Sequence, residues 1–148
     1  MAWPRSARRL LPLGLFLSLL PVGAPAAQED GSRRARKPAI TIRATPAVAF
    51  APARVFFVVE IRGGADDYED FYCASVEWDW GDETRSQSSA DCEPYEPGKS
   101  EIRRRFSTYH TFTRSGDFRV QFRLKKGGRV VGSAFTTVRI RPGVQEIG

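Results

Sequence analysis

The chain has 148 residues, which is enough for one ordinary domain and too few for two. Its 23 basic and 17 acidic side chains give a formal net charge of +6. Three of the basic residues lie in the N-terminal leader described next, which leaves 20 basic against 17 acidic side chains. An excess this small gives no support to nucleic-acid binding, and we predict no nucleic-acid partner.

Residues 1–26 have the features of a secretory signal peptide. Arg5, Arg8 and Arg9 precede an apolar stretch at residues 10–22, and Ala24-Pro25-Ala26 offers a small-x-small cleavage pattern. The alternative is a membrane anchor, but the apolar stretch is shorter than the roughly 20 residues that a spanning helix needs. We therefore predict export to the periplasm or the extracellular space, with no transmembrane segment after cleavage.

The segment after the leader, residues 27–38, contains four basic and no large apolar side chains. It is predicted to be a disordered basic linker. Its basic residues could tether the protein to anionic envelope polymers. We favour the alternative, in which the segment is a solvated spacer. The folded domain is predicted at residues 39–142, and residues 143–148 form a C-terminal tail.

The two cysteines, Cys73 and Cys92, are predicted to form a disulfide, because the chain is predicted to be exported. The closed loop has 18 intervening residues, for which the loop-entropy estimate is roughly 3 kcal/mol. A catalytic thiol and a metal site are the alternatives. Zinc needs about four nitrogen or sulfur ligands, and His110 is the only histidine in the chain.

Alternating apolar residues predict strands at residues 40–44, 55–62, 75–80, 102–112, 117–124 and 130–140. Pro46 and Pro52 interrupt the chain between the first two, as at a sheet edge or a bend. A hairpin turn is predicted at residues 125–128. Residues 83–99 show no period and are predicted to be a long insertion, stapled by the disulfide. Short strands without helices predict an all-β, antiparallel sandwich.

Three separate elements carry a family resemblance. The sequence Trp78-Asp79-Trp80-Gly81-Asp82 is followed by His110-Thr111-Phe112 and then by Gly116-Asp117-Phe118-Arg119-Val120. This order resembles the polycystic kidney disease (PKD) domain, whose pattern is an aromatic-Asp-aromatic-Gly-Asp-Gly turn, a later His-Thr-Tyr and a Gly-x-Tyr-x-Val strand. The resemblance covers about residues 40–140. It implies a single immunoglobulin-like sandwich of about seven strands.

The resemblance also implies structural roles for the motif residues. Trp78 would be the buried core tryptophan and Asp82 would form the turn. His110 and Thr111 would pack and bond beside that turn, and Phe118 would lead the strand that covers Trp78. The motif set is Trp78, Asp79, Trp80, Gly81, Asp82, His110, Thr111, Phe112, Gly116 and Phe118.

The chain departs from the pattern at two motif positions and by its insertion. Glu83 stands where the turn has its second glycine, at a position suited to a positive φ, which glycine adopts more easily. Phe112 replaces the tyrosine and keeps the ring without the hydroxyl.

Two catalytic constellations can be written from the sequence. His110 has Ser107 and Ser115 nearby, but there is no Gly-x-Ser-x-Gly elbow. Glu77 and Asp79 could pair for glycoside hydrolysis, but they share the polar face of a strand, where charges normally meet water. We predict that the protein is not an enzyme.

An acidic loop and three tyrosines are candidate binding features. Some PKD domains of bacterial collagenases bind calcium through an acidic loop at this place, so the resemblance leaves calcium open as a cofactor; the alternative is a solvated loop without EF-hand spacing. The tyrosines could stack on sugars or on a protein; the alternative is that Phe71 and Tyr72 cap the sandwich end and the other rings are isolated on the surface. The acidic set is Asp66, Asp67, Glu69 and Asp70, and the tyrosines are Tyr68, Tyr72 and Tyr95.

The predicted function is that of a non-catalytic, exported interaction or structural module of the cell envelope or the extracellular space. Its partner would be another envelope or secreted protein. The alternative is a carbohydrate-binding or polysaccharide-binding module.

Overall fold

The computed structural model describes residues 36–143. The predicted signal peptide at residues 1–26, most of the predicted linker at 27–38 and residues 144–148 of the predicted tail lie outside the described residues. At the end of the linker, Pro38 is buried against the domain. Within residues 36–143 no helix is both long enough and apolar enough to cross a membrane.

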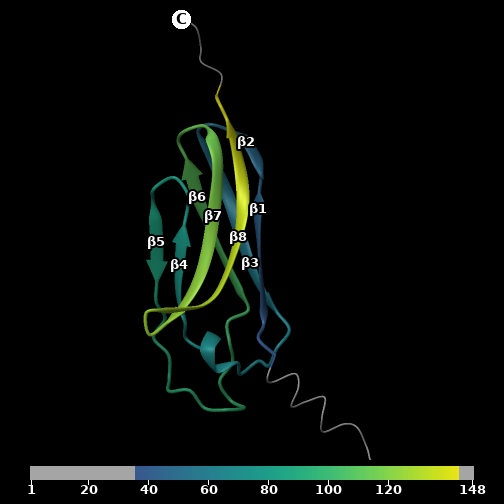
Figure 1. Cartoon of the computed structure of the whole chain (residues 1–148), viewed down its shortest axis with the longest axis vertical. Helices are drawn as coiled ribbons and strands as arrows, with labels where there is room; N and C mark the ends of the chain where they lie inside the picture. The colour runs from purple at the N-terminus through teal and green to yellow at the C-terminus, as the bar shows by residue number, and fades with distance from the viewer. Residues whose placement is uncertain (1–35, 144–148) are drawn as a thin grey trace, which may run out of the picture.

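The described chain forms eight strands in two sheets, with one short 3-10 turn (Figure 1). The three-stranded sheet has the order β1-β3-β6, and the five-stranded sheet has the order β2-β8-β7-β4-β5. The elements are β1 (Ala39–Thr45), β2 (Val48–Phe50), β3 (Ala53–Arg62), η1 (Glu69–Phe71), β4 (Ser75–Asp79), β5 (Arg85–Ser88), β6 (Arg105–Phe112), β7 (Gly116–Lys126) and β8 (Arg129–Arg141).

The core lies between the two sheets and is built from the predicted apolar stripes. In β3, Val55, Phe57 and Val59 have no exposed surface, and in β7 the same holds for Phe122 and Leu124. Each such side chain contributes roughly 1.5–3 kcal/mol on burial. The prediction of a single all-β sandwich with one disulfide is confirmed.

Two strands were not predicted. β2 pairs with the end of β8 in parallel, Val48 opposite Arg139, so the sandwich is not purely antiparallel. β5 lies inside the predicted insertion and pairs with β4, Ser88 opposite Val76. All four residues of β5 are exposed, so the backbone pairing holds this strand without an apolar stripe.

The predicted strand at residues 102–112 is shorter than expected, because β6 begins at Arg105. Ile102 is buried, as an inward strand residue would be, but its backbone N–H donates to the carbonyl oxygen of Asp66 at 2.7 Å. This bond ties the coil before β6 to the acidic loop and closes the end of the sandwich near the disulfide.

Candidate functional site

The turn that follows β4 requires a glycine at its centre. Gly81 has φ +75°, and a Cβ there would lie 2.7 Å from the backbone oxygen of Arg119. Asp82 then accepts the backbone N–H of Thr84 at 3.1 Å. Glu83 has φ +72°, so the chain takes the left-handed conformation at the position where the PKD pattern has glycine.

His110 joins β6 to this turn. Its ring stacks on that of Trp80, with 4.3 Å between centroids and 4° between planes, and its Nε2 lies 2.7 Å from Oδ2 of Asp82. Burial works to raise the pKa of Asp82, but hydrogen bonds from Thr84 and His110 outweigh it and lower that pKa. The histidine and the carboxylate therefore hold the fold at this end.

The other motif residues lie around this pair. Trp78 stacks on Trp80 at 5.1 Å and meets Phe122 of β7 at 5.0 Å. Phe118 lies in the same strand, and its ring contacts that of Phe112 at 4.6 Å. Thr111 does not bond beside the turn: successive strand residues point to opposite faces, so it is exposed on the outside of the three-stranded sheet.

The geometry does not supply a catalytic triad. Ser107 and His110 are three residues apart on β6, so alternation places them on opposite faces of the sheet. Among the hydrogen bonds of residues 36–143, the side chain of His110 is bonded to Asp82 and to neither Ser107 nor Ser115.

The carboxylates of Glu77 and Asp79 are paired with cations on the outer face of the five-stranded sheet. Glu77 accepts from Arg123 at 2.7 Å and from Lys125 at 3.0 Å, and these bonds lower its pKa. Asp79 accepts from Arg85 at 3.1 Å. A glycosidase needs one carboxyl that keeps its proton near neutral pH, and the lowered pKa of Glu77 is the opposite of that requirement.

The acidic loop binds an arginine from β6's leading segment. The guanidinium of Arg104 donates to Oδ1 of Asp66 at 2.7 Å. It also donates to three backbone carbonyl oxygens at 3.1–3.3 Å, that of Ile61 near the end of β3 and those of Gly63 and Ala65 in the loop that follows. The oxygen atoms that could have bound calcium at this place are thus hydrogen-bonded to the guanidinium of Arg104.

The remaining carboxylates of the loop diverge. Asp67 accepts the backbone N–H of Gly98 at 2.7 Å, and Asp70 faces Arg129 at 3.5 Å. No group of three acidic, histidine or cysteine side chains suited to a metal ion occurs in residues 36–143. The arrangement therefore does not fit the calcium site that the resemblance left open.

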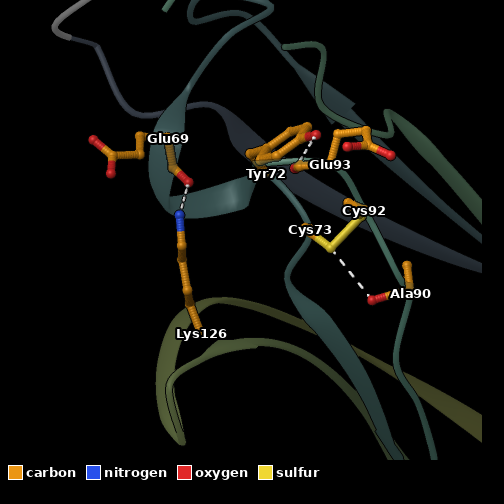
Figure 2. The surroundings of a disulfide bond; sticks show 7 residues. All are labelled: Glu69, Tyr72, Cys73, Ala90, Cys92, Glu93 and Lys126. Carbon is orange, nitrogen blue, oxygen red and sulfur yellow. Dashed lines mark hydrogen bonds between the residues drawn. A yellow bond between two sulfur atoms is a disulfide. The ribbon is translucent and has the colours of Figure 1, made fainter. Parts of the chain in front are cut away.

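The disulfide between Cys73 and Cys92 joins the segment before β4 to the segment after β5 (Figure 2). Next to it, the hydroxyl of Tyr72 donates to the carbonyl oxygen of Glu93 at 2.9 Å. From the β7–β8 hairpin, Lys126 reaches the carbonyl oxygen of Glu69 in η1 (Figure 2). One covalent bond and several hydrogen bonds thus fix this end of the sandwich.

The three tyrosines gather at the disulfide end, but their contacts are internal. The rings of Tyr72 and Tyr95 meet at 5.6 Å, and the hydroxyl of Tyr95 donates to the carbonyl oxygen of Asp67 at 2.8 Å. Tyr68 packs edge-on against Phe71 at 5.1 Å. Tyr68 and Tyr72 also pack against the core. These rings brace the loops, and they do not form an exposed aromatic platform.

A recess of about 140 Å³ opens beside the disulfide. Its apolar wall is formed by Phe71, Val76 and Phe106, and its rim includes Ser88 and Arg103. Its lining includes Ser88 of β5 and Phe106 of β6, and these two strands are each an edge strand of their sheet. The sequence indicated Phe106 only as a strand residue, and no pattern in it could have joined Ser88 to Phe106.

No family model and no curated protein matches the chain. Among solved structures, it is similar to the PKD domain of an M14-like peptidase from Thermoplasmatales archaeon SCGC AB-540-F20: the TM-score is 0.48 at 12% identity, over 72% of this chain and 98% of that one. It is also similar to the CARDB domain of the PF1109 protein from Pyrococcus furiosus, described in complex with di-metal ions. There the TM-score is 0.45 at 16% identity, over 70% and 94% of the two chains.

One of these neighbours is itself a PKD domain, the family that the sequence motif resembles. With TM-scores of 0.48 and 0.45, neither likeness carries a conclusion about this chain. The functional proposal below therefore depends on the chain's own residues.

Proposed function

We propose that the protein is an exported, non-catalytic binding module that recognises another protein through the recess beside its disulfide. The observation that supports this most strongly is a recess beside the disulfide, in which the buried side chains of Phe71 and Val76 and the half-buried Phe106 lie next to polar residues. A recess with apolar walls and a few polar groups is typical of a binding site.

The walls are held before any partner arrives. Cys92 is bonded to Cys73, so the segment that follows β5 cannot swing away from the start of β4. Farther along, the backbone N–H of Gly98 is bonded to Asp67 at 2.7 Å, and that of Glu96 to the hydroxyl of Ser100 at 2.8 Å. A loop ordered in advance loses little entropy on binding, which raises affinity for a given contact area.

The dimensions and chemistry of the recess indicate one inserted apolar side chain. A cavity of about 150 Å³ with apolar walls accepts a group as large as benzene, and this recess has about 140 Å³. Arg103 and Glu101 on its rim can bond polar groups on either side of that anchor. An apolar anchor inside a polar rim is the usual composition of a protein–protein hot spot.

The backbone offers a second means of recognition at the same place. Within residues 36–143, β5 is paired only with β4 and β6 only with β3, so each strand has one edge that no described strand covers. An extended segment of a partner could pair with such an edge while one of its side chains enters the recess. The predicted leader and the disulfide support a partner among envelope or secreted proteins.

The test is capture of partners on the immobilised, oxidised protein and on two matched variants. Ser88 lies opposite Val76 and lines the recess, so Ser88→Trp fills it. Gln87→Trp adds the same ring one residue earlier, on the other face of β5. We expect a saturable protein partner that the original chain and Gln87→Trp retain and Ser88→Trp loses. Equal retention by both variants would contradict the proposal.

A further inference from the structure

The outer face of the three-stranded sheet combines arginines, aromatic rings and hydroxyl groups. The register places Arg43, Val58 and Ser107 in one row and Thr45, Phe56 and Tyr109 in the next. The other outward residues of this face are Ala39, Thr41, Arg54, Glu60, Arg62, Arg105 and Thr111.

Near one end of this face, an arginine lies over an exposed tyrosine ring. The guanidinium carbon of Arg54 on β3 lies 4.1 Å from the ring centroid of Tyr109 on β6. The ring of Phe56, also on β3, lies 4.7 Å from the same tyrosine ring. Tyr109 is 54% exposed. The N–H groups of a guanidinium held over a ring in this way can bond a carboxylate in bidentate fashion.

The positive charge of this face is not balanced. Glu60 is its only carboxylate among the described residues, and it pairs with both Arg62 and Arg105. Neither Arg43 nor Arg54 forms a salt bridge in residues 36–143. The bond from Arg62 does most to lower the pKa of Glu60, and the charge of Arg43 also acts on that carboxyl and helps to lower its pKa. With four arginines and one carboxylate, the face keeps an excess of positive charge, which is complementary to an anionic ligand.

The spacing and width of the face favour a narrow, extended ligand. Arg43 lies one strand aside and four residues along from Arg54, which puts their Cα atoms about 14 Å apart at the usual strand dimensions. Three strands side by side make a strip only about 14 Å wide. A linear polymer with repeated anionic groups fits such a surface better than a globular partner.

We propose that this face binds an acidic polysaccharide, with Arg43 and Arg54 each bonding a sugar carboxylate. Tyr109 and Phe56 orient Arg54 and give apolar contact to the sugar ring. Hydroxyl side chains lie around the arginines and match the hydroxyl groups of a sugar: Ser107 is in the row of Arg43, Thr111 in the row of Arg54, and Thr45 in the row between them. This site is separate from the recess, so filling the recess with Ser88→Trp does not affect it.

The test is calorimetric titration of the oxidised protein with a short oligogalacturonate, in low and in high salt. We expect binding that weakens as salt rises, and a loss of tenfold or more in affinity for the Arg43→Ala/Arg54→Ala double variant. The matched control removes the same charge from the opposite face. This control is the double variant Arg119→Ala/Arg141→Ala. Arg119 also lies over an exposed ring, 3.8 Å from the centroid of Phe135, so the control removes a comparable contact. It should leave the affinity for the oligosaccharide unchanged.

Two comparison ligands separate the sugar from its charge. The fully methyl-esterified oligosaccharide has the same rings without the charge and should not bind, and polyglutamate has the charge without the rings and should bind at least tenfold more weakly. No binding of oligogalacturonate, equal affinity of the Arg43→Ala/Arg54→Ala variant, or equal affinity for polyglutamate would each overturn the proposal. Both double variants change exposed residues, so an unchanged melting temperature confirms that they fold.

Discussion

The two ends of the sandwich are fixed by different means. At the end where β4 runs into β5, a stack of rings and a set of turn hydrogen bonds lock Trp80, Asp82 and His110 together. At the end where β4 begins, the bond between Cys73 and Cys92 fixes a long exposed segment. Figure 1 shows β4 between these two ends of the molecule.

This difference indicates a division of roles. At the turn end, the side chains of His110 and Asp82 are bonded to each other, and each is less than one-fifth exposed. The disulfide end instead keeps an apolar recess open to solvent and supports it with bonds that lie behind it. Changes at the turn end should therefore act on stability alone, whereas changes at the disulfide end should act on stability and on binding.

The largest effect is expected from removing the disulfide. Changing Cys73 and Cys92 to serine frees a closed loop and should lower the free energy of unfolding by about 3 kcal/mol. Partner binding should weaken as well, because the wall of the recess loses its covalent anchor. Urea unfolding and titration with the captured partner measure the two effects, and unchanged affinity in the folded variant would break the proposed division of roles.

The next effect is expected from His110→Ala at the opposite end. The change removes a ring stack and leaves the carboxylate of Asp82 without one partner, which should cost about 2 kcal/mol of stability. Below its melting temperature this variant should bind the partner as the original chain does. Full stability together with a lost activity would instead restore the hypothesis of a catalytic histidine.

A smaller effect follows from the lowered pKa of Asp82. A carboxyl whose pKa is lower in the folded state adds stability at pH above its unfolded pKa of about 3.9, and this contribution disappears as the pH falls through the folded pKa. The original chain should therefore lose its advantage over Asp82→Asn as the pH is lowered below about 4. Urea unfolding of both proteins from pH 7 to pH 3 measures this, and a constant difference would contradict it.

The smallest effect is expected at Glu83. Its φ of +72° is unfavourable for a side chain with a Cβ, whereas glycine loses more entropy on folding. The relief of the unfavourable φ is partly cancelled by the larger entropy loss of glycine on folding. Glu83→Gly should therefore raise the free energy of unfolding by about 0.5 kcal/mol, with no change in partner binding. Loss of stability would mean that the side chain of Glu83 makes a contribution that the turn geometry does not reveal.

The sequence was sufficient for the parts of the fold that depend on local alternation. The inward stripes of β3 and β7 follow directly from Val55, Phe57 and Val59 and from Phe122 and Leu124. β5 could not be predicted, because its four residues are exposed and only its backbone pairing with β4 makes it a strand. β2 escaped prediction for a similar reason, since its parallel partner is about ninety residues later in the chain.

The candidate site was less predictable because its residues are brought together by tertiary structure. The acidic loop could be read as a calcium site because Arg104, its cation, is 38 residues away from Asp66. The three tyrosines were candidates for a binding platform until their partners, among them Asp67 and Glu93, were known. Likewise, the recess is lined by residues of both β5 and β6, which belong to different sheets.

Hydrogen–deuterium exchange of the oxidised protein, with and without its captured partner, tests the central claim most directly. Binding at the recess should slow exchange in β5, in the segment up to Cys92 and in the first half of β6. The turn at residues 80–84 and His110 should exchange as before. Protection confined to that turn, or spread over the outer face of the five-stranded sheet, would contradict a binding site at the disulfide end.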